Sequence, residues 1–178
     1  MSKSLLVISY YANMPGACQA EWIDDRIFAY LEQGYEISLI SSSCCFKHDN
    51  AEIDHKRVPT LSPHGAWYEY EEIKRRGITY PRGRFLMSYL KFMTFLAKVL
   101  KSLGFSSGEG RWSWFLTSTL ACIFKDSRKF EYVFTTGGPA SAHLTGILFA
   151  RLHGKKVICE LQDPLSGGEG IGRNKLSI

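Results

Sequence analysis

Apolar residues in the first forty positions form two different patterns. Residues 4–10 (SLLVISY) are a near-continuous apolar run, which is typical of a strand covered on both faces. Residues 20–33 carry apolar side chains at four-residue spacing and acidic side chains in the first turn, so we expect a helix that Gly34 ends. Residues 35–42 (YEISLISS) alternate and predict a second strand. This order is a strand–helix–strand unit, in which the two strands should be parallel.

A second unit of the same kind lies near the other end of the sequence. Residues 132–136 predict a strand, residues 140–152 a helix and residues 157–161 another strand. Small residues recur on one face of this helix, where they let it lie close to a sheet: Ala142, Gly146 and Ala150. Two such units predict an α/β fold with an open, doubly wound, Rossmann-like parallel sheet flanked by helices.

The middle of the chain has weaker patterns. A third strand is expected around Val58, and residues 67–76 (WYEYEEIKRR) predict a short exposed helix. Three histidines occur here without metal-ligand spacing, and we expect them at the surface: His48, His55 and His64. A further helical segment is expected over residues 112–125.

Residues 84–103 predict a long helix whose apolar side chains cover most of its circumference. Its polar side is one narrow line: Ser88, Lys91, Thr94, Lys98 and Lys101. A lysine every turn or two is incompatible with a membrane span. One interpretation is a crossover helix buried on the sheet by Leu86, Leu90, Met93, Leu96 and Leu100. The other adds a peripheral contact of residues 84–103 with the headgroups of an anionic membrane.

Composition narrows the classes of protein. A chain of 178 residues with 45% hydrophobic residues predicts one globular domain, and the N-terminal apolar run is too short for a secretory signal, so a cytoplasmic location is expected. Five cysteines without C-x-x-C pairs predict neither a zinc site nor a disulfide framework. With a modest net charge of +5, no nucleic-acid partner is expected.

Motifs of several enzyme classes are missing. The sequence has no G-x-x-x-x-G-K-[ST] loop, no G-x-S-x-G elbow and no D-x-D motif, and the glycines at 168, 170 and 172 lack the spacing of a dinucleotide fingerprint. In doubly wound folds ligands bind outside the carboxyl ends of the strands, where the strand order reverses. That rule predicts a crevice lined by residues 13–19 and 136–143. Gly137 and Gly138 either offer N–H groups to an anion there or simply make a tight turn.

Three stretches together resemble the N-terminal domain of family 4 glycosyltransferases, which have the GT-B fold. They are the first apolar run with its loop ending in Gly16, the stretch QGYEISLISS, and above all TTGGPASAHLTGILFARLHGKKVICELQDP. The family motif has Ser or Thr, small residues or prolines, a Ser-x-His helix start and a strand ending in a D-x-R-D-P-like motif. The matching residues here are Thr136, Gly137, Gly138, Pro139, Ser141, His143 and the residues 160–164. Glu160 and Gln162 stand where Asp and Arg are usual, so a role carries over to Asp163 but not to them.

The resemblance implies a retaining, metal-independent transfer of a sugar from a nucleotide-sugar to a glycan or lipid-linked acceptor in cell-surface polysaccharide synthesis. No cofactor is implied beyond the nucleotide-sugar donor. Residues 1–165 would form the acceptor-side domain, and the glycine-rich residues 166–178 would be a loop at a truncated end. The C-terminal donor-binding domain with its E-x7-E motif has no counterpart in the sequence. We therefore expect this chain to fold but to transfer no sugar alone.

Site residues follow from the resemblance and from the crevice rule. Asp163 is expected to act on the acceptor as hydrogen-bond partner or base, with His143 beside it. The donor phosphates are expected near Pro15, Gly16, Ala17, Thr136, Gly137 and Gly138, and the acceptor near Asn13, Gln19 and Ser141. Two alternatives stay open, because Asp163 before a proline can cap a turn and His143 can be a packed neutral side chain. Two other functions also stay open, a nucleotide- or dinucleotide-binding Rossmann domain and a non-catalytic interaction domain.

Overall fold

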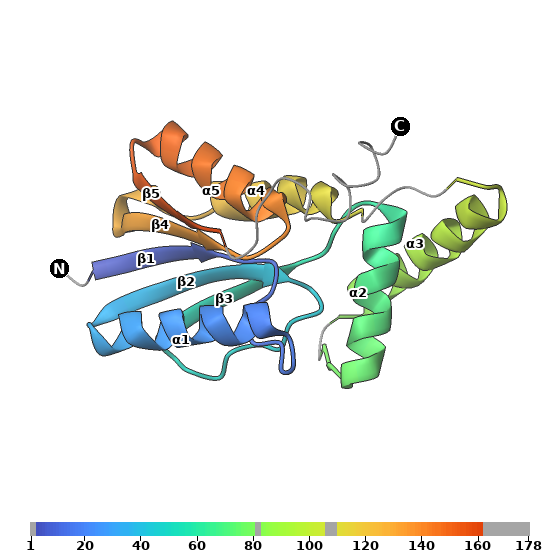
Figure 1. Cartoon of the computed structure of the whole chain (residues 1–178), viewed down its shortest axis with the longest axis horizontal. Coiled ribbons are helices and arrows are strands. Elements are labelled where there is room, and N and C mark those ends of the chain that lie inside the picture. The colour runs from blue at the N-terminus through green and yellow to red at the C-terminus, as the bar shows by residue number, and fades with distance from the viewer. Residues whose placement is uncertain (1–2, 81–82, 106–109, 162–178) are drawn as a thin grey trace, which may run out of the picture.

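A computed structural model describes residues 3–80, 83–105 and 110–161 of the chain (Figure 1). Its centre is a five-stranded sheet in the order β3-β2-β1-β4-β5, and every neighbouring pair is parallel. The strands are β1 (Lys3–Ile8), β2 (Tyr35–Ser42), β3 (Ile53–Val58), β4 (Phe130–Thr136) and β5 (Lys156–Glu160). The α/β fold with an open parallel sheet flanked by helices is thus confirmed.

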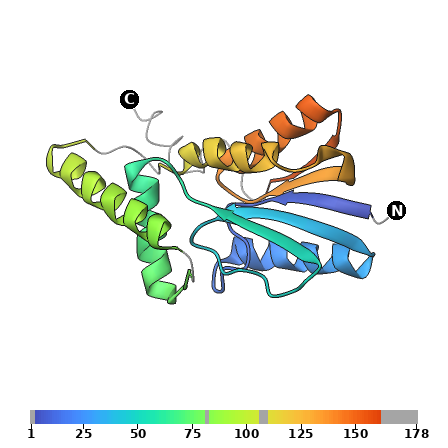
Figure 2. The same ribbon diagram turned by 180° about the vertical axis from the view of Figure 1, so that it is seen from behind.

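Within the described residues, five α-helices and two short 3-10 helices accompany the strands. They are α1 (Cys18–Glu32), α2 (Pro63–Arg76), α3 (Arg84–Ser102), η1 (Arg111–Ser113), α4 (Trp114–Ile123), η2 (Ser127–Lys129) and α5 (Ala140–His153). Helix α1 covers one face of the sheet, and α4 and α5 cover the other (Figures 1 and 2). Helices α2 and α3 lie together beyond one end of the sheet.

Side chains of the central strand β1 alternate between the two faces, and each set has its own core. Leu5 and Val7 pack with residues of α1, among them Ile23 and Ile27. Leu6 and Ile8 belong to the larger core on the other face: its members include Trp114, Val133, Phe149 and Ala150. Residues 4–10 therefore read as a continuous apolar run because both faces of the strand are covered.

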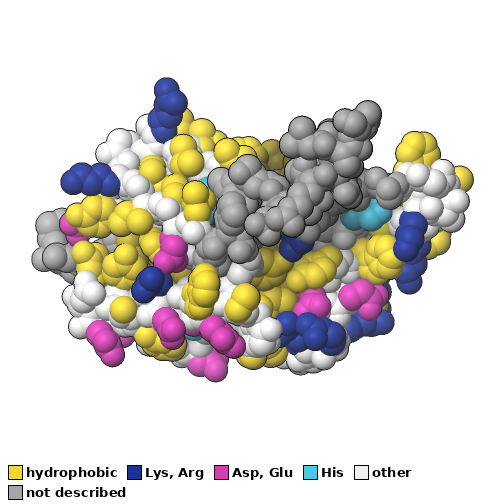
Figure 3. Space-filling model, viewed as in Figure 1, with side chains coloured by type: hydrophobic (Ala, Val, Ile, Leu, Met, Phe, Trp, Pro, Cys, Tyr) yellow, Lys and Arg dark blue, Asp and Glu magenta, His cyan; other side chains and the backbone are white. Residues whose placement is uncertain are grey.

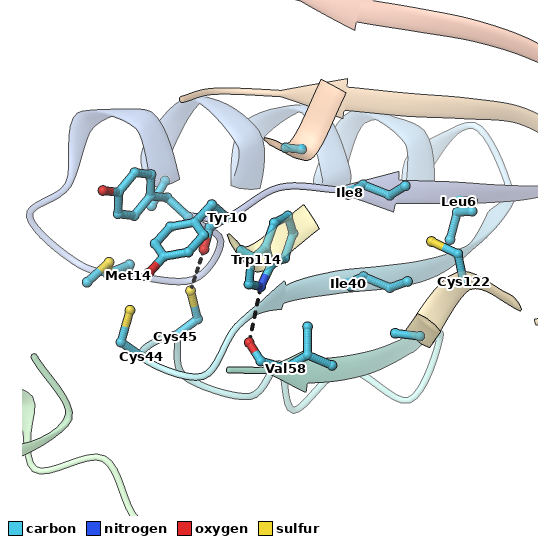
Figure 4. Packing of buried hydrophobic residues seen from close by; sticks show 14 of the residues in the cluster. Leu6, Ile8, Tyr10, Met14, Ile40, Cys44, Cys45, Val58, Trp114 and Cys122 are labelled. Carbon is cyan, nitrogen blue, oxygen red and sulfur yellow. Dashed lines mark hydrogen bonds between the residues drawn. The ribbon is translucent and has the colours of Figure 1, made fainter. Parts of the chain in front are cut away.

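Trp114, at the start of α4, organises the core at the carboxyl ends of the strands (Figure 4). Its side chain is fully buried, and its Nε1–H donates to the Val58 carbonyl at 3.1 Å. The Tyr10 ring meets it edge-on with ring centroids 5.4 Å apart. The Cys45 thiol donates to the Tyr10 carbonyl at 3.3 Å. These bonds satisfy polar groups inside an apolar environment, so this end of the core has one defined arrangement.

The small-residue stripe of α5 has the close approach that the sequence predicted. A Cβ placed on Gly146 would overlap Cγ2 of Thr135 on β4, so only glycine fits at this distance from the sheet. Ala142 and Ala150 are also buried on the same face. Gly154 ends the helix in the left-handed conformation, with φ of 62°.

Three expectations for the middle of the chain are wrong. Helix α2 is not simply exposed, because Glu69 and Tyr70 are buried on its inner side. Helix α3 packs on α2 rather than on the sheet, and Thr94 of the expected polar line is buried with its Oγ1 donating to the Leu90 carbonyl at 2.7 Å. His48 is buried, and the largely buried His55 accepts from the His48 N–H at its Nδ1.

Candidate functional site

The strand order reverses between β1 and β4, at the centre of the sheet. The chain leaves β1 toward α1 on one face and leaves β4 toward α5 on the other, while Leu6 pairs with Val133 and Ile8 with Thr135 in parallel register. Diverging connections of this kind open a crevice at the carboxyl ends of the strands. A Cβ on Gly138 would lie 3.8 Å from Nε2 of Gln19, so the two predicted loops do lie side by side.

The loop after β1 is held by residues on three other segments. Asn13 has a left-handed backbone with φ of 49°, and its N–H donates to both carboxylate oxygens of Asp24 on α1 at 3.0 Å. The Asn13 side chain donates to the Lys47 carbonyl at 3.1 Å. Arg76 of α2 donates to the Pro15 carbonyl. Asn13, expected at the acceptor, therefore shapes the loop, while Pro15 and Gly16 form its exposed tip.

Thr136, at the end of β4, begins a polar chain across the crevice. Its buried hydroxyl donates to Oε2 of Glu160 at 2.8 Å, and Oε1 of Glu160 accepts from Nε of Arg26 on α1 at 3.1 Å. Arg26 and Glu160 line a cavity of about 330 Å³ together with Trp22, Asp25 and Leu161. The carboxylate of Glu160 thus lies beside the crevice, although the resemblance carries no role over to this position. Asp163 lies outside the described residues.

His143 and Ser141 lie inside the first turn of α5. His143 is 5% exposed, and its Nδ1 shares a hydrogen bond of 2.8 Å with Oγ1 of Thr135. Burial lowers the pKa of His143, and a hydrogen bond with the Gly137 backbone opposes that shift. The Ser141 hydroxyl donates to the Arg111 carbonyl at 3.3 Å. Both side chains are therefore bonded within the protein, and burial favours the neutral form of the imidazole.

Arg111 is a crevice residue that the sequence did not reveal. It begins η1, and its guanidinium donates to the Tyr11 hydroxyl in the loop after β1. The same guanidinium lies 5.3 Å from the ring centroid of Tyr68 on α2. Burial raises the pKa of Tyr11, and the positive charge of Arg111 opposes this. Because 100 residues separate Arg111 from Tyr11, no local pattern could have predicted the contact.

A buried carboxylate lies behind the crevice, on the inner side of α2. Glu69 accepts from the Tyr10 hydroxyl at 2.9 Å, from the Ser43 hydroxyl at 2.5 Å and from the Thr60 N–H at 3.1 Å. These three donors lie one or two residues after the ends of β1, β2 and β3. Burial raises the Glu69 pKa to about 7, although the three donors pull it down. Glu69 is inaccessible to a ligand and fixes α2 against the strand ends.

Comparisons with protein-family models, curated proteins and solved structures found no match. The function of the chain has to be inferred from its own residues.

A cavity of about 800 Å³ lies at the opposite end of the sheet from the crevice. It is lined by charged residues that include Glu36, Asp54, Lys56 and Lys125. Lys125 pairs with Asp54 there, and the Lys125 hydrogen bond lowers the Asp54 pKa. This cavity is large enough to bind a ligand. The crevice is nevertheless the better candidate for the functional site, because parallel sheets bind ligands at the carboxyl ends of their strands.

The described part of the chain has neither a metal-binding cluster nor a membrane-spanning helix. Across residues 3–80, 83–105 and 110–161, no three His, Cys, Asp or Glu side chains are placed to hold a metal ion. In the same residues every helix is too short or too polar to cross a membrane.

Proposed function

We propose that the chain is the acceptor-side domain of a GT-B glycosyltransferase. The reaction is retaining and metal-independent, and it moves a sugar from a nucleotide-sugar to a glycan or lipid-linked acceptor in cell-surface polysaccharide synthesis. One observation carries the proposal. Two stretches resemble family 4 glycosyltransferases, the first strand with its following loop and the unit that starts at Thr135. They come together at the crevice, where a Cβ on Gly138 would lie 3.8 Å from Nε2 of Gln19.

Each wall of the crevice has a role in this proposal. The exposed loop tip at Pro15 and Gly16, with the half-buried Ala17, and the Gly137–Gly138 turn approach the donor phosphates, since neither places a bulky side chain in the way. Asp163 orients the acceptor hydroxyl and receives its proton as the new bond forms. Arg26 and Thr136 hold the Glu160 carboxylate beside the same crevice. A second domain supplies the rest of the donor site.

The outer side of α3 brings the enzyme to the cytoplasmic face of a membrane in this proposal. Phe85, Phe92 and Phe95 project from it and are 91%, 64% and 66% exposed. Arg84, Lys91 and Lys98 are exposed on the same helix. No Asp or Glu occurs from residue 73 to residue 108, a stretch with eight Lys and Arg residues, so the charge suits anionic headgroups. A lipid-linked acceptor would then lie within reach.

A binding and transfer assay on the full-length protein tests the proposal. Calorimetry with a panel of nucleotide-sugars and with NAD⁺ and NADP⁺ should give saturable binding of a nucleotide-sugar alone. Transfer of labelled sugar to lipid-extract acceptors should follow. Asp163→Asn should lower the transfer rate by about 100-fold while the melting temperature stays within about 2 °C, because the substitution removes a general base and keeps the size of the side chain. Binding of a dinucleotide alone would contradict the nucleotide-sugar donor. Transfer at the parent rate by Asp163→Asn would contradict the role of Asp163 as the base.

A further inference from the structure

A second concave surface lies between α2 and α3. It is a cavity of about 350 Å³ lined by His64, Trp67, Tyr68 and Glu71 from α2 and Lys98 from α3. This volume is at the lower end of the range for small-molecule sites, so it suits one small ligand rather than a helix of a partner protein. The face of the molecule in Figure 3 shows hydrophobic side chains between acidic and basic ones over these two helices.

Two aromatic side chains give the cavity its apolar wall. Trp67 and Tyr68 are each half-buried, so each ring is anchored but still partly accessible. The Lys101 ammonium lies 5.5 Å from the Trp67 ring centroid, and the Arg111 guanidinium lies 5.3 Å from that of Tyr68. Such cation–π contacts restrain the rings. A ring face is electron-rich and attracts polarised C–H groups, which the apolar face of a pyranose presents.

Two charged groups of the cavity can bond to sugar hydroxyls. Glu71 is an acceptor and Lys98 is a donor, and both are exposed at the cavity. Sugar hydroxyls both donate and accept, so one sugar unit can bond to the two groups at once. Together with the aromatic wall, this donor and this acceptor suit a polyhydroxyl compound.

The cavity adjoins the crevice through one side chain. Arg111 contacts Tyr68 in the cavity wall and also donates to Tyr11 in the loop after β1. We propose that the cavity between α2 and α3 binds one pyranose unit of the acceptor, next to the unit that reacts. This inference rests on the proposed function for its place in the reaction, although sugar binding itself does not require transfer.

Saturation-transfer NMR on the full-length protein tests the site directly. The probes are methyl glycosides of glucose, galactose, mannose and N-acetylglucosamine, with their disaccharides. At least one should bind saturably, and Trp67→Ala should weaken that binding about tenfold or more. Glu71→Gln, at an exposed position where folding is not at risk, should weaken it as well. Trp112→Ala is the matched control, because Trp112 is 69% exposed outside the cavity, and it should bind like the parent.

Two results would overturn the inference. One is that no glycoside binds the parent, and the other is that Trp67→Ala and Glu71→Gln both bind like Trp112→Ala. In the transfer assay, Trp67→Ala should raise KM for a glycan acceptor and leave kcat nearly unchanged, since the bound unit does not react. Transfer by Trp67→Ala with an unchanged KM would contradict the proposed sugar site but not the proposed transferase function. Sugar binding that depends on Trp67, without transfer from any nucleotide-sugar, would support the sugar site and contradict the transferase function.

Discussion

Helices α2 and α3 lie side by side, and their burial is the reverse of what their compositions suggest. Helix α2 (PHGAWYEYEEIKRR) is rich in charge, yet it buries Glu69 completely against the strand ends. Helix α3 (RFLMSYLKFMTFLAKVLKS) is mostly apolar, yet it buries only Leu90, Thr94 and Ala97 among its described residues and exposes three phenylalanines. Burial here depends on whether partners exist at the contact, because a carboxylate with three donors can be buried while a phenylalanine without a facing core cannot.

The largest expected effect on the free energy of unfolding is that of replacing Glu69 of α2, and Glu71 of the same helix is its control. Glu69→Ala leaves the Tyr10 hydroxyl, the Ser43 hydroxyl and the Thr60 N–H without their acceptor in a buried place, so the free energy of unfolding should fall by about 4 kcal/mol. Glu71→Ala, two positions later and exposed, should change it by less than about 0.5 kcal/mol. Urea unfolding measures both. Equal effects would show that Glu69 does not carry the contact between α2 and the strands.

The pH dependence of stability is a second test of the burial of Glu69. The Glu69 pKa is raised from 4.5 to about 7 in the folded protein, mainly by burial. Because the folded pKa is the higher one, the stabilising contribution of Glu69 is full below about pH 4.5 and is lost as the pH rises through about 7. The stability difference between the parent and Glu69→Gln should therefore shift by about 3 kcal/mol against the parent between pH 4.5 and pH 8. A difference that stays constant over this range would contradict a raised pKa.

The smallest effect on stability is expected on α3. Phe92→Ser with Phe95→Ser should change the free energy of unfolding by less than about 0.5 kcal/mol per site, since both rings already face solvent. The same pair should abolish sedimentation with anionic liposomes, and Arg84→Gln with Lys91→Gln should weaken it. Leu116→Ser with Leu120→Ser, at exposed apolar positions of α4, is the control and should sediment like the parent. A large loss of stability in the phenylalanine variant would contradict the exposure of these rings and remove the proposed membrane contact.

The sequence predicted the elements well wherever the pattern is local. The strand at 35–42 has the expected bounds, since its alternation and the preceding Gly34 mark it, and α3 ends within one residue of its expected end. The crevice followed from the two strand–helix–strand units, because the handedness of such units fixes where strand order reverses. What the sequence could not predict depends on contacts between distant residues. The donors of Glu69 are 59, 26 and 9 residues away, and Arg111 meets Tyr11 across 100 residues.

The same limit applies to the contacts of the expected site residues. Asn13 is expected at the acceptor, and the sequence did not reveal that Asp24 and Lys47 engage its backbone and side chain. For His143 the structure fits the alternative of a packed side chain, because Thr135 lies directly behind it on β4 and α5 packs close to the sheet. Polar residues at strand ends therefore mark the neighbourhood of a site better than they mark its contacts.

One measurement tests most directly whether the crevice between Gln19 and Gly138 is where the sugar is transferred. Gly138 has room for a Cβ, which would point toward Gln19, so Gly138→Leu should fold with nearly the parent melting temperature and fill the crevice. Its rate of sugar transfer in the full-length protein should fall by about 100-fold, because the substrates lose their alignment. Ala51→Leu, beside the large cavity at the other end of the sheet, should transfer at the parent rate. Parent-rate transfer by Gly138→Leu, or loss of transfer in Ala51→Leu alone, would contradict the account.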